Sequence, residues 1–442
     1  MRKLITILLV ILILAGIGTG GWFYIKANPQ IADTYIANFK ENLFNLRLEY
    51  ERKKIEKQAV SNEPETIPVN QSVQPEIEQT EEPNETQQVI PVQSPQAIPT
   101  QSPRVGEDIV TKVFYPVSNP IALKGAANCK YAKYSDGILC VSESTVDFYT
   151  ADAKLKWSRA IQISNPVLKV NGNYILIFEQ GGKKFTVFEK NTEIIKTETS
   201  EIILNGNISA NADIAFVTEK PYYQGAVCVY NSSGEEIFSR SFGSENVIAV
   251  AISDSRRVAV ALMSLRTQIY SKLVFLDVNK SDEDVSVEYD DTLIYDIDFS
   301  KNNLIAFADN RMISLSSGGR EQWVNDYTEK KLMHYSKDVA DIRLLMFDNN
   351  NNAEMSVISN SGREKSKMQT DVIPDFSDIC DGNIIYNNAR NLIFTRLNGD
   401  VDAKYTASRD IQKAYFIDKD NILVVYNQSI EFLRLKRKES EE

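Results

Sequence analysis

The stretches NADIAFV (211–217) and NNLIAFA (302–308) have the same shape, a polar turn followed by a dense run of apolar residues. A short apolar run bounded by turn residues is typical of a buried β-strand. The same shape recurs in SDGILCV (135–141), NGNYILIF (171–178), SRRVAVAL (255–262), GNIIYN (382–387) and DNILVVY (420–426), and in a degenerate copy, VADIRLLMF (339–347). Successive copies begin about 40 residues apart, which indicates a repeat of one supersecondary unit.

Each copy is followed by a second turn and a further strand. The second turns are TADAKLKW (150–157), NSSGEEIF (231–238), SSGGREQW (316–323), SNSGREKS (359–366) and LNGDVDAK (397–404). Four antiparallel strands in about 40 residues are typical of a β-propeller blade. We therefore predict an all-β fold, a β-propeller of eight blades, or of seven if the degenerate copy at 339–347 is not a blade.

The two ends of the repeat region complement each other. The last unit offers only three strands, in IQKAYFI (411–417), NILVVY (421–426) and SIEFLRL (429–435), whereas DIVTKVFYP (108–116) is a spare strand before the first unit. We expect this N-terminal strand to complete the last blade, because closure leaves no open sheet edge. Closure would bury Ile109, Val110, Val113 and Phe114.

The N-terminus predicts a membrane anchor. Residues 4–25 carry no charge, and at 1.5 Å per residue such a helix spans a bilayer core of about 30 Å. Arg2 and Lys3 precede the run and the aromatic residues 22–24 end it, so we expect an uncleaved, single-pass signal-anchor with a cytoplasmic N-terminus and an extracytoplasmic propeller. A cleaved signal peptide is the alternative, with a shorter apolar core.

The predicted domains follow in order. Residues 1–27 form the cytoplasmic tip and transmembrane helix, and residues 28–59 form an amphipathic helix with apolar residues at 3–4 spacing. Residues 60–105 contain eight prolines, seven Glu and no aromatic residue, which predicts a disordered linker. The propeller spans 106–436 and a charged tail 437–442. A GxxxG pair, Gly16 and Gly20, and the amphipathic stripe are both compatible with a homodimer.

Composition excludes several functions. The net charge of −11 argues against a broad nucleic-acid-binding surface. The single histidine, His334, rules out a multi-histidine metal site and leaves a satisfied structural histidine as the simplest interpretation. The four cysteines are Cys129, Cys140, Cys228 and Cys380. We expect buried thiols, with Cys129–Cys140 as the one disulfide to consider.

Two acidic stretches resemble functional motifs only superficially. Asp277, Asn279, Ser281 and Glu288 have the spacing of a calcium loop, but Asp282 stands where the loop needs glycine. Residues 348–354 (DNNNNAE) are predicted to form a hairpin tip. A third acidic group, Glu283, Asp284, Glu288, Asp290 and Asp291, is placed by strand alternation on a solvated surface and not in a converging pair.

Trp157 in TADAKLKW and Trp323 in SSGGREQW resemble the D-x-x-G-x-x-x-W repeat of pyrroloquinoline-quinone-like (PQQ-like) propellers. With the anchor and linker, the chain resembles an uncharacterised family of membrane-anchored PQQ-like propeller proteins of Gram-positive bacteria. That resemblance implies a protein-binding platform. True quinoproteins have a vicinal disulfide beside the quinone, and no two cysteines are adjacent here, so we expect no quinone cofactor.

These observations favour a binding protein over an enzyme, and no catalytic, cofactor-binding or metal-binding residue is assigned. We predict a protein-binding scaffold, adaptor or sensor at the cell envelope. The alternative is a carbohydrate-binding or glycan-processing head acting on cell-wall material. Exposed aromatic residues flanked by carboxylates at one propeller mouth would favour glycans, whereas a broad mixed apolar and polar surface would favour a protein partner.

Overall fold

The computed structural model describes residues 110–265, 269–280, 285–327, 329–348, 352–370 and 372–438. The predicted transmembrane helix, amphipathic helix and linker (1–105) lie outside the described residues, as does most of the predicted tail. Within the described ranges, no helix is long and apolar enough to cross a membrane. The structure therefore bears on the propeller alone.

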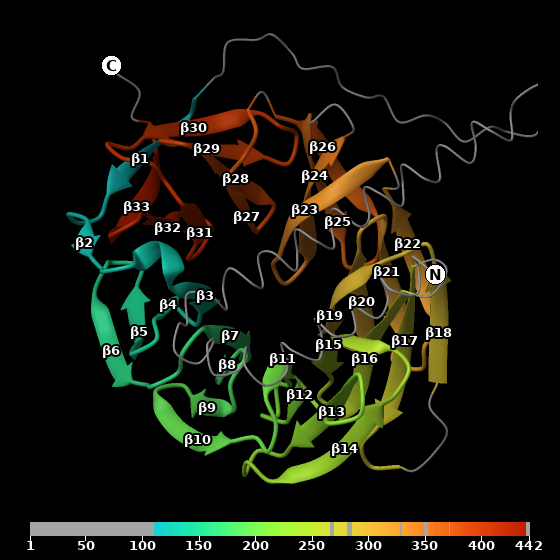
Figure 1. The fold of residues 1–442 in the computed structure, drawn as a ribbon. Coiled ribbons are helices and arrows are strands. Elements are labelled where there is room, and N and C mark those ends of the chain that lie inside the picture. The colour runs from blue at the N-terminus through green and yellow to red at the C-terminus, as the bar shows by residue number, and fades with distance from the viewer. Residues whose placement is uncertain are drawn as a thin grey trace, which may run out of the picture. The chain divides into compact units, whose positions relative to one another are not determined.

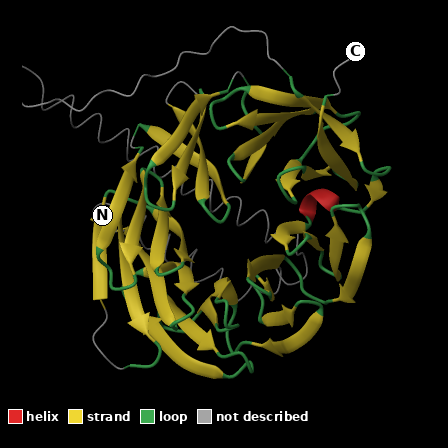
Figure 2. Ribbon diagram, turned by 180° about the vertical axis from the view of Figure 1, so that it is seen from behind, coloured by secondary structure: helices red, strands yellow, loops and turns green. Residues whose placement is uncertain are grey.

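The described residues form eight antiparallel sheets arranged as the blades of a ring (Figure 1). Figure 2 shows the same ring from behind, with one short helix, η1 (Ala126–Asn128), among the strands. In blades 1 to 7 the strand that comes first in the chain lies nearest the centre, and in blade 8 that place is taken by β31 (Lys413–Phe416). Blade 1 consists of β3 (Lys130–Tyr134), β4 (Gly137–Val141), β5 (Thr145–Thr150) and β6 (Leu155–Ala160), and blade 2 of β7 (Pro166–Asn171), β8 (Tyr174–Glu179), β9 (Lys184–Glu189) and β10 (Thr192–Glu198). Blade 3 consists of β11 (Ile203–Ile208), β12 (Ile214–Thr218), β13 (Gly225–Tyr230) and β14 (Glu236–Phe242), and blade 4 of β15 (Asn246–Ile252), β16 (Arg257–Leu265), β17 (Ile269–Asp277) and β18 (Val285–Asp290).

Blades 5 to 7 have the same order, and blade 8 takes its outermost strands from the N-terminal end of the propeller. Their strands are β19 (Ile294–Ser300), β20 (Asn303–Ala308), β21 (Arg311–Ser316) and β22 (Glu321–Asp326); β23 (Lys330–Lys337), β24 (Asp341–Asp348), β25 (Ala353–Ser359) and β26 (Glu364–Gln369); β27 (Phe376–Cys380), β28 (Asn383–Asn388), β29 (Asn391–Arg396) and β30 (Val401–Thr406); β31 (Lys413–Phe416), β32 (Asn421–Val425), β33 (Ser429–Arg437), β1 (Lys112–Pro116) and β2 (Ile121–Ala122).

The repeated apolar runs are the second strands of the blades. Both faces of a second strand pack against neighbouring blades, so it reads as a continuous apolar run and does not alternate. In β20, for example, every residue from Leu304 to Ala308 is buried. The degenerate copy is β24, a full second strand, so the prediction of eight blades is confirmed and the seven-blade alternative is wrong.

Ring closure by the N-terminal strand is also confirmed. β1 pairs antiparallel with β33, with Phe114 opposite Leu435, and β2 extends the pairing with Ile121 opposite Ile430. The predicted burial is only partly right. Phe114 is buried, Val110 and Val113 are half-buried because they lie at the outer edge of the blade, and Ile109 lies outside the described residues.

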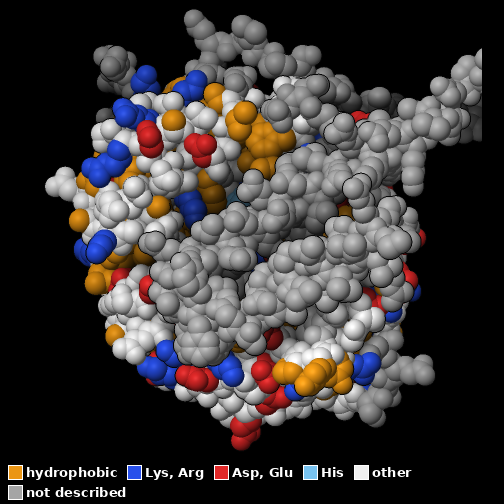
Figure 3. Space-filling model, in the orientation of Figure 1, with side chains coloured by type: hydrophobic (Ala, Val, Ile, Leu, Met, Phe, Trp, Pro, Cys, Tyr) orange, Lys and Arg blue, Asp and Glu red, His pale blue; other side chains and the backbone are white. Residues whose placement is uncertain are grey.

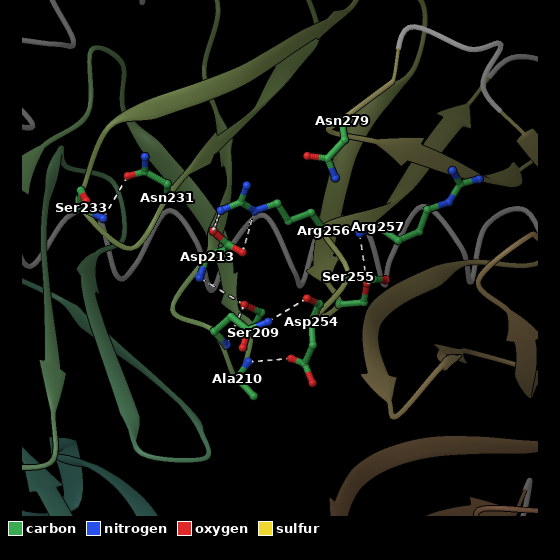
Figure 4. Close-up of polar contacts among 12 residues, drawn as sticks. Ser209, Ala210, Asp213, Asn231, Ser233, Asp254, Ser255, Arg256, Arg257 and Asn279 are labelled. Carbon is green, nitrogen blue, oxygen red and sulfur yellow. Dashed lines mark hydrogen bonds and ion pairs between the residues drawn. The ribbon is translucent and has the colours of Figure 1, made fainter.

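Polar contacts between turns fasten neighbouring blades to each other. In Figure 4 the Asp254 carboxylate of blade 4 accepts a hydrogen bond from the Ala210 N–H of blade 3, at 2.7 Å. Arg256 donates two hydrogen bonds to Asp213, from Nε at 2.9 Å and from Nη2 at 3.0 Å. These bonds satisfy turn groups at the end of an interface that is largely apolar.

Candidate binding site

The eight inner strands surround a central channel and all run in the same direction along it. Each blade adds four antiparallel strands, so every inner strand begins at the same face of the ring. We call the face where inner strands begin the mouth face, and the face where they end the far face. Residues early in an inner strand therefore line the mouth, and residues late in the strand line the far end.

Side chains that project into the channel narrow its far end. Asn207 of blade 3 donates a hydrogen bond from Nδ2 to Asp298 Oδ1 of blade 5, at 3.4 Å, and Lys337 of blade 6 forms an ion pair with the same carboxylate. Lys133 Nζ of blade 1 lies 3.6 Å from Cys380 Sγ of blade 7. Blades 3 and 5, and blades 7 and 1, are each separated by one blade, so these side chains project into the far end of the channel.

The mouth carries a row of rings from four successive blades. His334 of β23 lies 4.7 Å from Phe376 of β27, measured between ring centroids, and Phe376 lies 4.9 Å from Tyr415 of β31. Tyr415 in turn lies 5.6 Å from Tyr131 of β3. All four side chains are half-buried, so each ring keeps some surface accessible. These contacts define a continuous aromatic row along half of the channel wall.

A buried polar cluster holds the histidine end of this row in place. Arg343 is fully buried, and its Nη2 lies 2.7 Å from His334 Nδ1 and 2.9 Å from the Ser377 carbonyl oxygen. Arginine can only donate, so Nδ1 of His334 accepts and the ring is neutral. Burial, with the charges of Arg343 and Lys413, lowers the pKa of His334 to about 3. His334 is thus a positioned, uncharged ring.

Asp378 is the acidic member of the same cluster. Its Oδ2 accepts a hydrogen bond from the Phe416 N–H of blade 8, at 2.9 Å, so the carboxylate joins blades 7 and 8. Burial raises the pKa of Asp378, and burial lowers the pKa of Arg343 to about 10, with Asp378 partly compensating. Asp378 is engaged through the Phe416 N–H, and Arg343 through Nη2, while Arg343 Nη1 is buried without a hydrogen-bond partner among the described residues.

The inner strands carry a strong excess of lysine. Together they contain seven Lys and three Asp, in a chain whose net charge is −11. The three aspartates are all engaged: Asp296 with the Tyr335 hydroxyl, Asp298 with Lys337, and Asp378 as above. Among the described residues, Lys130, Lys133, Lys169 and Lys413 have no ion-pair partner. The channel wall is therefore electropositive.

Mutual repulsion among these lysines is visible in their ionisation. Burial lowers the pKa of Lys337 to about 8, and Lys169 on the opposite wall adds repulsion. Burial, followed by the charge of Lys130, lowers the pKa of Lys413. Figure 3 shows basic and hydrophobic side chains meeting inside the central hollow, on the side of β27 and β31. An anionic group placed there would relieve this repulsion.

Exposed apolar side chains continue the aromatic row onto the mouth face. Met333, next to His334, is 60% exposed, and Ile373, on the connection that leads into β27, is 53% exposed. A separate pair on the β12–β13 turn, Tyr222 and Tyr223, lies on the same face at blade 3. Clustered exposed apolar side chains mark interaction surfaces on soluble domains.

The acidic residues that the sequence suggested as a calcium loop or a carboxylate pair do not form a site in the described residues. Asp277 forms ion pairs with Arg257 and Lys280. Glu288, on the neighbouring strand β18, lies opposite Lys272, which is five residues before Asp277 on β17. The calcium-like set therefore does not converge. Ser281 to Asp284 lie outside the described residues. Glu288 and Asp290 are exposed on the outer strand β18, and Asp291 is exposed just after it.

The acidic stretch at 348–354 connects the two strands of a hairpin, as predicted. Phe347 pairs with Ala353, and Asp348 accepts two hydrogen bonds from Asn352, from the main-chain N–H at 2.8 Å and from Nδ2 at 2.9 Å. The Glu354 side chain is buried and paired with Lys330 at 2.6 Å. The described residues at both ends of this stretch therefore make structural contacts, and residues 349–351 lie outside the described residues.

The cysteines and tryptophans also have structural roles. All four cysteines are buried free thiols, so the structure contains the predicted thiols and no Cys129–Cys140 bridge. The neighbouring thiol of Cys129, together with burial, raises the pKa of Cys140. Trp157 stacks on Phe148 at 5.7 Å, and Trp323 Nε1 donates a hydrogen bond to the Asn360 carbonyl oxygen of blade 6, at 3.3 Å.

Sequence reasoning did not single out the aromatic row or the Arg343–Asp378 cluster. One signal was available. Arg343 is a charge inside the otherwise apolar core of VADIRLLMF, and such a residue has to find buried partners. The partners come from β23 and β27, which only the ring arrangement brings together.

The fold and the channel define the class of this protein, an all-β, eight-bladed β-propeller with a lysine-rich, aromatic-lined centre. Within that class, the chain belongs to DUF5711, described as a family of unknown function, whose family model matches residues 112–435. No curated protein sequence matches the chain.

Solved structures show the same fold at low sequence identity. The C-terminal WD40 domain of Sif2 is 11% identical, with a TM-score of 0.50 over 73% of this chain and 99% of that one. BamB from Moraxella catarrhalis is 12% identical, with a TM-score of 0.47 over 73% and 99%. AztD from Citrobacter koseri is 10% identical, with a TM-score of 0.47 over 68% and 90%. These similarities extend to the fold alone.

Proposed function

We propose that this chain is a membrane-anchored, extracytoplasmic propeller that binds another protein at the cell envelope as a scaffold, adaptor or sensor. The observation that carries the binding role is the mouth face, where aliphatic, aromatic and unpaired basic side chains are continuous with one another. Protein interfaces combine an apolar centre rich in aromatic residues with a polar rim. Residues 4–25 support the anchor, because the run is uncharged and long enough to cross a bilayer.

The chemistry of the mouth favours a protein over a glycan. Glycan recognition would place exposed carboxylates beside the aromatic rings. Two carboxylates lie next to this row: Asp378, which accepts a hydrogen bond from the Phe416 N–H, and the exposed Asp375, which accepts one from the Ala389 N–H. Both carboxylates are thus engaged within the protein, whereas Lys130 and Lys413 near the rings have no ion-pair partner among the described residues.

A capture experiment with two matched variants tests the binding role. The tagged full-length chain is solubilised from envelopes in mild detergent, as wild type, Ile373→Asp and Leu155→Asp. Ile373 lies on the mouth face and Leu155 on an outer strand, and both are 53% exposed. We expect Ile373→Asp to lose a specific co-purifying protein that Leu155→Asp retains. Equal capture by all three would contradict the proposal.

The anchor has its own test. A reporter that is active only outside the cytoplasm, fused after Glu442, should be active in cells. Activity of a cytoplasm-only reporter at the same position would reverse the proposed orientation.

A further inference from the structure

The aspartates of the inner strands have partners within the protein, whereas two of the lysines have none among the described residues, and this difference points to a ligand. Every inner-strand aspartate has a partner inside the protein, whereas Lys130 and Lys413 have no ion-pair partner among the described residues. Both lysines lie at the start of their strands, β3 and β31, and therefore at the mouth. Two unpaired cations held near each other are costly unless a negative group binds between them.

The surface beside these lysines is aromatic. Tyr131 and Tyr415, whose ring centroids are 5.6 Å apart, belong to the same two strands as the lysines. Phe376 extends the row, and its ring lies 4.9 Å from that of Tyr415. Lys413 and Tyr415 are two residues apart on β31 and share a face, so a ligand that reaches Lys413 also contacts half-buried rings. It needs negative charge and an apolar or aromatic group within a few ångströms of each other.

The far end of the channel limits how the ligand enters. The Asn207–Asp298–Lys337 contacts and the Lys133–Cys380 contact project into the channel there and narrow it. A ligand would therefore enter from the mouth face and insert a side chain, and it would not thread through the ring. This geometry fits an extended peptide segment lying across the mouth.

We propose that the channel mouth binds an acidic peptide segment of the partner protein, with Lys130 and Lys413 contacting its carboxylates and the Tyr131–Tyr415–Phe376 rings receiving an adjacent aromatic or aliphatic side chain. This inference rests on the proposed function and names the chemistry of the partner. Charge complementarity decides the occupant, because the local surface is basic in an acidic protein. Met333 and Ile373 supply further apolar contact at the edge of the mouth.

Peptide binding to the full-length chain tests this directly. The probe is a fluorescein-labelled peptide of Glu and Asp residues with one central Phe, followed by fluorescence anisotropy. Two comparison peptides carry Lys in place of every acidic residue, or Ser in place of Phe. We expect saturable binding of the acidic Phe peptide, weaker binding of the Ser peptide, no binding of the Lys peptide, and weakening by added salt.

Matched protein variants assign the site. Lys130→Glu with Lys413→Glu should weaken binding about tenfold or more, since like charges at the contact repel. Lys154→Glu with Lys190→Glu, two exposed lysines in turns of the far face, should bind as wild type. Lys130→Gln with Lys413→Gln, checked by circular dichroism, covers the case in which the reversed charges disturb folding. Equal binding by all the variants, or no binding of the acidic peptide, would overturn the inference.

The chain's own acidic stretch provides a final control. Residues 60–105 contain seven Glu and one Arg. If the probe binds only a chain that lacks residues 60–105, that stretch is the occupant and the partner-peptide inference is wrong. Loss of peptide binding with capture still dependent on Ile373 would overturn this inference and leave the proposed function standing. Loss of both would overturn the two together.

Discussion

The half of the ring that closes it, blades 6 to 8 with blade 1, differs from the opposite half in what holds the blades together. Between blades 3 and 4 the buried contact is apolar apart from Asn207, which accepts a hydrogen bond from the Ile252 N–H, and the polar contacts of Figure 4 lie in the turns. Between blades 6, 7 and 8 the fully buried Arg343, with His334 and Asp378, stands directly behind the channel wall. A ring with no binding role needs only interfaces like the one between blades 3 and 4.

The difference indicates that the closing half is shaped for more than stability. Buried charged groups contribute little net stability compared with apolar side chains of the same volume, because desolvation offsets their attraction. Here they fix the orientation of His334 and join the strands that carry Phe376 and Tyr415. We infer that this half sets the geometry of the mouth, and the predictions below test how strongly the two halves differ.

The largest effect is expected from opening the ring. In the full-length chain, deleting residues 106–117 removes β1, exposes the edge of β33 and removes the burial of Phe114. We expect a loss of at least about 3–5 kcal/mol in unfolding free energy, the usual cost of deleting one large aromatic side chain from a core. Deleting residues 94–105, a segment of the same length, should leave the thermal midpoint unchanged. Equal midpoints would refute closure by β1.

The next effect compares a buried arginine with a surface one. Arg343→Ala removes a fully buried charged side chain and its hydrogen bonds to His334 and the Ser377 carbonyl oxygen, so we expect about 3–5 kcal/mol of destabilisation in urea unfolding. Arg320→Ala, which truncates an exposed arginine on the β21–β22 turn of blade 5, should cost under about 1 kcal/mol. If the two substitutions cost the same, the contrast between the halves would not hold.

A pH dependence isolates His334, the only histidine in the chain. Its pKa is about 3 when folded and near 6.5 when unfolded, so the unfolded state binds more protons between these values. Stability should therefore be full above pH 6.5 and fall as the pH drops, by about 2 kcal/mol from pH 7 to pH 5. Glu219, whose pKa burial raises, contributes with the opposite sign, so the difference between wild type and His334→Gln is the measurement. An unchanged slope in His334→Gln would show that the ring is not buried and neutral.

The smallest effect concerns the turns of the opposite half. Asp254→Ala removes the acceptor of the Ala210 N–H, and we expect about 1 kcal/mol of destabilisation. Asp254→Asn keeps an acceptor oxygen and should lose less. A cost for Asp254→Ala as large as that of Arg343→Ala would mean that the turns, and not the apolar core, hold these blades together.

Much of the fold could be predicted because its second strands are buried on both faces. That burial requires a continuous apolar run such as IAFV in β12, which can be recognised in the sequence alone. The missing fourth strand of blade 8 could also be predicted, because the strands of each repeat can be counted in the sequence. The mouth was not, because its rings come from β23, β27, β31 and β3, which are far apart in the chain and mix polar with apolar residues. Tyr131 or Lys413 alone gives no signal; only ring closure places them together.

The most direct test of the account asks where the partner touches the propeller in cells. A photoreactive phenylalanine analogue is placed in the full-length chain at Ile373 on the mouth beside the channel, at Tyr222 on the same face at blade 3, or at Leu155 on an outer strand. We predict that illumination crosslinks one defined protein from position 373, and that Lys130→Glu with Lys413→Glu abolishes the product. A product of equal yield from position 155 or 222, unaffected by the lysine substitutions, would contradict recognition at the channel mouth.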